Sequence, residues 1–173
     1  MSPLEIKSLI VDVPDFPKPG IVFKDITPVL ANPGAFKAAV ELLAEHGTRL
    51  RCDAVLAIES RGFILGAPVA LELGVPLHLV RKRGKLPRAA LTVSYELEYG
   101  VDHLEVHADA IVAGGRYLVV DDVIATGGTA AAVASLIARQ GATVAACLFL
   151  VELTFLAGRA RLEGVDVVSL ISY

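Results

Sequence analysis

Two aspartates followed by a Gly-Thr loop are the residues whose types and spacing most clearly indicate chemistry. Asp121 and Asp122 end a short apolar run, 117–120, which is typical of a buried strand. They precede Thr126-Gly-Gly-Thr129 and an Ala-rich helical run that Gly141 would end. The glycines let backbone amides approach an anion, and a helix N-terminus carries roughly half a positive charge. Because adjacent acids can also accept hydrogen bonds from ribose hydroxyls, the segment predicts a site for a phosphorylated sugar.

The loop has neither of two familiar phosphate-binding patterns, G-x-x-x-x-G-K-[ST] and G-x-G-x-x-G. A tight turn with two solvated acids is the alternative explanation of the same spacing. The whole segment 119–129, however, resembles the phosphoribosyl-diphosphate motif of the type I phosphoribosyltransferases. The resemblance implies that Asp121 and Asp122 hold the ribose hydroxyls and stabilise positive charge growing on the sugar. It also implies that backbone amides bind the 5′-phosphate of 5-phosphoribosyl 1-diphosphate, from Ala125, Thr126, Gly127, Gly128 and Thr129.

A second loop, 59–62, follows the apolar strand 53–58 and precedes a helical run. Since parallel sheets carry ligand loops at the carboxyl ends of their strands, we expect this loop and the Asp121 loop to share one rim. Segment 81–88 follows the next strand with five cations and no acid, although a solvated face is the usual explanation of such a run. Cations stabilise a departing pyrophosphate. Both segments resemble the family, which implies pyrophosphate binding by Ser60, Arg61, Arg81, Lys82 and Lys85.

The Pro-rich segment 15–26 is similar to the opening segment of the adenine phosphoribosyltransferases, whose backbone reads the adenine edge. The implied adenine-binding residues are Val22, Phe23 and Lys24; an arm packed on the core is the alternative. The family often has Arg at the position of Lys24, and lysine does not replace an arginine fork at a stacked or bidentate site.

Segment 91–107 alternates apolar and polar residues on either side of Gly100, which predicts an antiparallel hairpin inserted between two strand–helix–strand units. It is similar to the lid of the same family. The resemblance implies that Glu98 contacts the purine as general acid/base and that Tyr99 helps to close the lid. A solvated strand carboxylate is the alternative for Glu98.

The remaining elements indicate an α/β fold. We expect a short helix within 4–11, a helix over 33–50 that Gly47 could interrupt, an internal strand over 143–151 and an edge strand over 165–171. The resemblance implies a type I phosphoribosyltransferase fold, with a central, mainly parallel sheet flanked by helices. It also implies a single domain, 1–173, with an N-terminal hood (1–30) and a basic loop and lid hairpin (81–107).

Composition narrows the function further. The chain has 173 residues and a net charge of −3, which does not favour nucleic-acid binding. No apolar run reaches the roughly 18 residues of a membrane span, and the first residues lack a signal-peptide pattern. Two cysteines without such a signal suggest reduced thiols and a cytoplasmic location. The mean hydropathy of +0.62 suggests a fully buried sheet or a homodimer. The four histidines show no metal-ligand spacing with cysteine, so we expect them to be structural or surface residues.

The implied reaction joins adenine and 5-phosphoribosyl 1-diphosphate into AMP and pyrophosphate, a step of purine salvage. Mg²⁺ would be held mainly by substrate oxygens and water. Two alternatives remain at this point. One is a relative that uses a 6-oxopurine (xanthine, guanine or hypoxanthine), which a site for the adenine amine would discriminate against. The other is a non-catalytic sensor of the diphosphate sugar that regulates transcription, although no basic DNA-binding segment precedes the first core strand.

Overall fold

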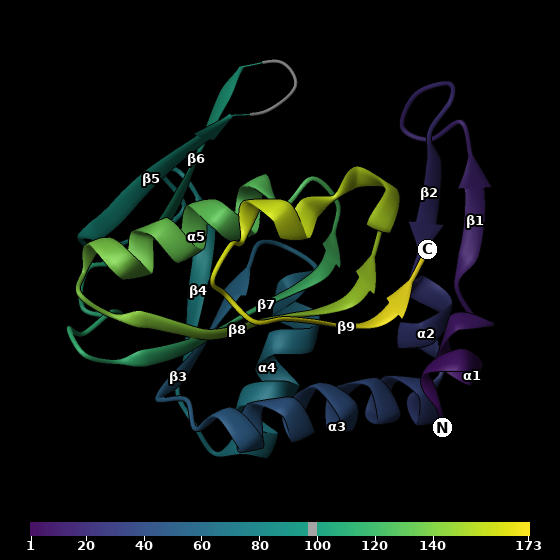
Figure 1. Cartoon of the computed structure of the whole chain (residues 1–173), viewed down its shortest axis with the longest axis horizontal. Coiled ribbons are helices and arrows are strands. Elements are labelled where there is room, and N and C mark those ends of the chain that lie inside the picture. Colours follow the sequence, from purple (N-terminus) through teal and green to yellow (C-terminus); the bar gives the residue numbers. More distant parts are fainter. Residues whose placement is uncertain (97–99) are drawn as a thin grey trace.

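A seven-stranded sheet forms the centre of the computed structural model, which describes residues 1–96 and 100–173 (Figure 1). The strand order is β5-β6-β4-β3-β7-β8-β9, and the five strands from β4 to β9 in this order run parallel. The strands are β3 (Ala54–Ile58), β4 (Leu77–Lys82), β5 (Ala90–Glu96), β6 (Val101–His107), β7 (Arg116–Ile124), β8 (Thr143–Glu152) and β9 (Val167–Ser172). The expected central, mainly parallel sheet is therefore confirmed.

Helices cover both faces of this sheet, so its inner strands read as nearly continuous apolar runs. On one face, α3 (Pro33–Leu50) and α4 (Gly62–Leu73) pack on side chains such as Val55 and Leu118. On the other face, α5 (Gly128–Arg139) packs on their strand neighbours, including Leu56 and Val119. Figure 1 shows the sheet between these two helical layers.

Local sequence signals explain where α3 begins and where α4 ends. The Asn32 side chain accepts hydrogen bonds from the amides of Gly34 and Ala35, both at 3.1 Å, and so caps α3. Gly74 ends α4 with a positive φ of 66°. The expectation that Gly47 could interrupt α3 was wrong. A Cβ there would lie 2.7 Å from Leu73 Cδ1, so the glycine instead allows close packing of α3 on α4.

The N-terminal region differs from the expectation in one respect. Helix α1 (Pro3–Lys7) ends before residue 11, because Val11–Pro14 forms β1, which pairs with β2 (Val22–Asp25) in a separate antiparallel hairpin. A further short helix, α2 (Thr27–Ala31), connects this hairpin to α3. Figure 1 shows the β1–β2 hairpin standing beside one end of the main sheet.

The main sheet extends further than the local sequence pattern indicated, both along β7 and at the edge formed by the β5–β6 hairpin. Asp121 and Asp122 do not end β7: Asp121 pairs with Phe149 and Val123 with Val151, so the ladder with β8 continues to Ile124. The predicted hairpin β5–β6 exists, and it joins the edge of the main sheet where β6 pairs with β4. Strand β9 lies at the opposite edge, as expected. Among the described residues, no helix is long and apolar enough to cross a membrane.

Candidate functional site

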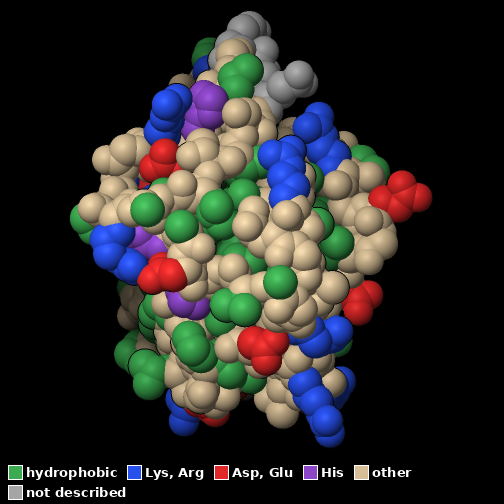
Figure 2. Space-filling view, turned by 90° about the vertical axis from the view of Figure 1, so that its left-hand side faces the viewer, with side chains coloured by type: hydrophobic (Ala, Val, Ile, Leu, Met, Phe, Trp, Pro, Cys, Tyr) green, Lys and Arg blue, Asp and Glu red, His purple; other side chains and the backbone are tan. Residues whose placement is uncertain are grey.

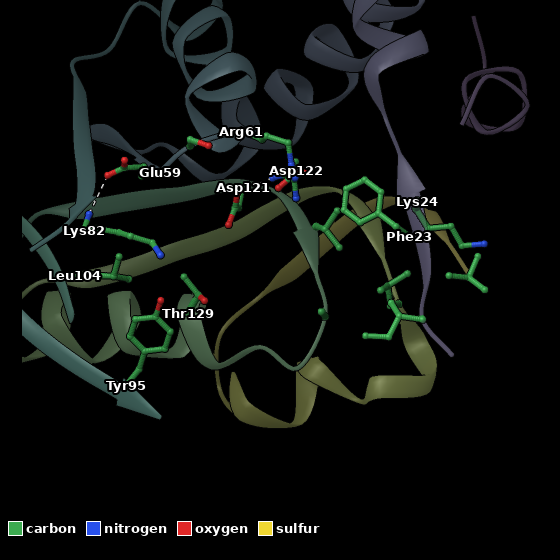
Figure 3. Close-up of a pocket in the computed structure, with 16 residues that line it drawn as sticks. Phe23, Lys24, Glu59, Arg61, Lys82, Tyr95, Leu104, Asp121, Asp122 and Thr129 are labelled. Carbon is green, nitrogen blue, oxygen red and sulfur yellow. Dashed lines mark hydrogen bonds and ion pairs between the residues drawn. The ribbon is translucent and has the colours of Figure 1, made fainter. Parts of the chain in front are cut away.

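A cavity of about 430 Å³ lies where the carboxyl ends of the parallel strands meet the β1–β2 hairpin (Figure 3). It brings together the loop after β3, the end of β7 and the loop after it, in agreement with the expected shared rim. The residues that line it are Ile21, Val22, Phe23, Lys24, Glu59, Ser60, Arg61, Lys82, Tyr95, Leu104, Asp121, Asp122, Val123, Ala125, Thr129 and Leu153.

The two aspartates of β7 occupy different environments. The Asp122 side chain is 7% exposed and forms an ion pair with Arg61 Nε. The Asp122 amide donates to Asp121 Oδ1 at 2.9 Å, and Asp121 points into the cavity (Figure 3). Burial, and then the neighbouring charge of Asp122, raise the pKa of Asp121 well above its usual value, while Arg61 opposes the shift. One carboxylate is therefore committed to Arg61, and the other faces the space for a ligand.

The loop between β7 and α5 encloses a smaller hollow of about 90 Å³ beside the main cavity, and Asp121 borders both spaces. Gly127 has a φ of 78°, a conformation that favours glycine, and α5 begins at the next residue. No side chain of the described residues caps this first turn of α5. All five residues predicted to bind the 5′-phosphate border the hollow, namely Ala125, Thr126, Gly127, Gly128 and Thr129.

The basic residues predicted to bind pyrophosphate divide into two groups. Arg61 and Lys82 line the cavity together with Ser60. Arg81 and Lys85 instead form ion pairs with Glu59, at 3.3 and 2.8 Å.

Glu59 is the centre of this second group, a role that the sequence pattern did not indicate. Its carboxylate also accepts the Lys82 amide at 2.9 Å, the bond drawn in Figure 3. Burial would raise the pKa of Glu59, but the hydrogen bonds from Lys85, the Lys82 amide and Arg81 outweigh it and lower the pKa to about 2. Glu59 therefore stays ionised at neutral pH and holds the start of the basic loop at the cavity edge.

Strand β2 brings Val22, Phe23 and Lys24 to the cavity. The Arg61 Cζ atom lies 5.4 Å from the centroid of the Phe23 ring, within cation–π range. The Lys24 amine points away from the cavity centre in Figure 3. It lies 2.7 Å from Asp12 Oδ1 and 4.0 Å from the centroid of the Tyr173 ring, and its side chain is only 11% exposed. This geometry favours a role for the backbone, rather than the amine, of Lys24 at the cavity.

Six cavity residues were absent from the predicted set: Ile21, Glu59, Tyr95, Leu104, Val123 and Leu153. Leu153 directly follows β8, whose carboxyl end lies at the same rim as those of β3 and β7. The end of this predicted strand was the sequence signal that could have identified Leu153. The predicted Glu98 and Tyr99 lie outside the described residues, and their roles stay predictions. Within residues 1–96 and 100–173, no three His, Cys, Asp or Glu side chains are grouped as metal ligands.

Comparisons with known proteins agree with this geometry. Residues 26–168 match the phosphoribosyl transferase domain. The chain is 54% identical to the adenine phosphoribosyltransferase of Carboxydothermus hydrogenoformans over 170 residues, which cover 98% of this chain and 100% of the relative. The crystal structure of the Thermoanaerobacter pseudethanolicus adenine phosphoribosyltransferase superimposes with a TM-score of 0.96 at 50% identity, covering 99% and 100% of the two chains. The Saccharomyces cerevisiae enzyme, complexed with adenine and an imino-altritol bisphosphate, gives a TM-score of 0.90 at 41% identity and 97% coverage of both chains.

Proposed function

The chain belongs to the phosphoribosyltransferase family, and we propose that its rim cavity converts adenine and 5-phosphoribosyl 1-diphosphate into AMP and pyrophosphate. The protein is thus a pentosyltransferase of purine salvage. The observation that carries this conclusion is the juxtaposition, around one cavity, of the Gly-Thr loop, the Arg61–Lys82 edge and the hood strand β2. The relative of 54% identity matches 98% of the chain and is an adenine phosphoribosyltransferase.

The sugar phosphate would occupy the end of the cavity at the N-terminus of α5. The amides of 125–129 bind the 5′-phosphate, because they surround a hollow at a helix start that no side chain caps among the described residues. Asp121 accepts hydrogen bonds from ribose hydroxyls and stabilises positive charge that develops on the sugar. Asp122 contributes to the same task and also orients Arg61, with which it is paired.

The diphosphate would lie between Arg61 and Lys82, which both line the cavity with Ser60. Arg81 and Lys85 add positive charge from the edge, where Glu59 positions them. A Mg²⁺ ion would bind together with the diphosphate and be held mainly by substrate oxygens and water, as is usual for this ion on polyphosphates. When bound, Mg²⁺ would neutralise charge on the diphosphate.

Adenine would lie against β2, where backbone groups of Val22, Phe23 and Lys24 read its edge and the Phe23–Arg61 pair lies beside the base. Glu98 would handle the proton on the purine, and Tyr99 would help to close the lid. A general acid/base of this kind contributes about 10²–10⁴ in rate. Glu98→Gln should therefore lower kcat by at least about tenfold with little change in affinity for the diphosphate sugar; full turnover would remove Glu98 from catalysis.

A panel of bases tests the proposed reaction. The protein is mixed with Mg²⁺ and 5-phosphoribosyl 1-diphosphate, then with adenine, hypoxanthine, guanine, xanthine, uracil or orotate, and nucleotide formation is followed. We expect AMP from adenine and no product from the other bases. Product from a 6-oxopurine alone would contradict the assignment of β2 to adenine. Binding of the diphosphate sugar without turnover of any base would instead support a sensor.

We also propose that the protein is a homodimer in the cytoplasm. Apolar side chains are exposed on α4 and β4, where Leu71 is 82%, Ile64 42% and Leu79 38% exposed. Figure 2 shows the side of the molecule on which β5 and β6 lie. Hydrophobic side chains are present at this surface too, between scattered charged groups. Both cysteines are free thiols in the structure, which suits a reducing compartment.

Sedimentation equilibrium at micromolar concentration tests the homodimer. A single species of 18.2 kDa would contradict it. Leu71→Glu should dissociate the dimer, because it places a charge in the apolar surface. Leu4→Glu, at a residue of α1 that is 78% exposed, is the matched control and should not.

A further inference from the structure

An ion pair outside the cavity lining, between the buried Glu152 and the half-exposed Arg159, joins the end of β8 to the turn that follows it. Glu152, the last residue of β8, is 6% exposed. Arg159 lies in the 3₁₀-helix η2 (Gly158–Arg161) and donates through Nε and Nη2 to the two Glu152 oxygens, both at 2.6 Å. Ser169 on β9 donates to Glu152 Oε2 at 2.5 Å, and Arg159 Nη1 donates to the Val167 carbonyl at 2.5 Å. The pair therefore ties η2 to two strands with a bidentate geometry.

The residue before Arg159 touches the Gly-Thr loop through its backbone. A Cβ on Gly158 would lie 2.3 Å from the Ala125 carbonyl oxygen and 3.0 Å from the Gly127 nitrogen. Conversely, a Cβ on Gly127 would lie 2.2 Å from the Gly158 carbonyl oxygen. Two glycines thus allow the two backbones to meet directly, without a side chain between them.

This contact supports the loop through a residue, Gly158, that lines neither the cavity nor the hollow. Amides that bind a phosphate must converge on it, and a misplacement of about 1 Å can cost about 10²-fold in an enzymatic rate. No side chain of the described residues caps the start of α5, so the loop backbone takes its position from its packing. On the η2 side, the packing partner is Gly158, one residue away from the anchored Arg159.

We propose that the Glu152–Arg159 pair is a clamp that holds Gly158 under the loop 125–127 and thereby shapes the 5′-phosphate site. Glu152, Gly158 and Arg159 are then positioning residues that act through the loop without touching the substrate. The proposal rests on the function proposed above, because it assigns the supported loop to the sugar phosphate.

Gly158→Ala tests the contact directly, and the probe is ribose 5-phosphate, which presents the phosphate without diphosphate or base. Gly47→Ala is the matched control. It also adds a methyl group at a crowded buried glycine, 2.7 Å from Leu73 Cδ1, but in the α3–α4 interface. Titration calorimetry on both folded variants should show ribose 5-phosphate binding weakened at least tenfold by Gly158→Ala and changed less than twofold by Gly47→Ala. In steady-state assays, Gly158→Ala should raise the KM of the diphosphate sugar and leave that of adenine within twofold.

Arg159→Lys tests the clamp itself. Lysine keeps the charge but not the two-pronged contact, so we expect binding several-fold weaker than wild type and stronger than in Gly158→Ala. Wild-type affinity of Arg159→Lys for ribose 5-phosphate would overturn the clamp. Wild-type affinity of Gly158→Ala would overturn the whole proposal, and so would an equal loss of affinity in Gly47→Ala. If the wild-type protein forms AMP and these variants bind normally, only the positioning role fails. If the wild-type protein neither binds ribose 5-phosphate nor forms AMP, the proposed function fails with it.

Discussion

Removal of the Arg61 guanidinium should reveal the cost of placing two adjacent carboxylates at the end of β7. The Asp122 side chain is 7% exposed and pairs with Arg61, which is itself 45% exposed. Loss of one partner of a fully buried pair costs about 3–5 kcal/mol. Because water can partly replace a half-exposed guanidinium, we expect Arg61→Ala to lower the free energy of unfolding by about 2 kcal/mol at pH 7. For a chain of this length, that loss lowers Tm by about 4–8 °C.

Thermal melts of Arg61→Ala, Asp122→Asn and the double variant isolate the ion pair. With Asp122 neutral, the further change at Arg61 should cost much less, so the two substitutions should couple by about 1–2 kcal/mol. Additivity within about 0.5 kcal/mol would refute the role of the pair in stability.

Acidification should reduce the difference between Arg61→Ala and wild type. The pKa of Asp121 is raised in the folded protein, and Arg61 opposes that rise. A carboxyl with a raised folded-state pKa binds its proton more tightly in the folded state, so its penalty is present at high pH and relieved as pH falls. The variant should therefore recover stability relative to wild type as the pH falls below 7, and an increasing difference would contradict this reasoning.

Three other predictions follow from single contacts. Asp121→Asn should raise Tm at pH 7, because it removes a half-buried, desolvated charge whose pKa is raised, and should lower AMP formation at least tenfold; a lower Tm in melts would contradict the desolvation argument. The ionised Glu59 contributes stability that is present above its ordinary pKa of 4.5 and is lost as the pH falls toward about 2. The Tm difference between wild type and Glu59→Gln should therefore disappear across that interval. A difference that persists at pH 2 would exclude the ion pairs as its cause. Tyr173→Ala should raise the KM of adenine several-fold with little change in kcat, because the Tyr173 ring contacts Lys24 beside the base site. Tyr173→Phe keeps the ring and should match wild type in steady-state assays. Equal KM values in all three proteins would show that Tyr173 does not support the adenine site.

Local sequence signals were sufficient to predict a strand or a helix end where that element depends on its own residues. The runs 53–58 and 143–151 are apolar enough to indicate buried strands, and Gly74 marks the end of a helix because it adopts a positive φ at low cost. The same signals misjudged β7. Two adjacent acids are unusual inside a strand, so Asp121 was expected to end it, whereas pairing with Phe149 carries the ladder further.

The sequence by itself determined the order of the main-sheet strands and of the helices between them, the Gly-Thr loop, the basic run and their assignment to one rim, since these depend on residue type and short spacing. Only the tertiary structure decided which partners the side chains take. Lys24 packs on Tyr173, Arg81 and Lys85 pair with Glu59, and Gly158 meets the loop of Gly127. In each case the contact joins different elements of the fold, and its existence depends on ångström-scale distances set by the packing of the whole sheet. For this reason the candidate ligand loops could be found from the sequence, whereas the contacts that hold them in place could not.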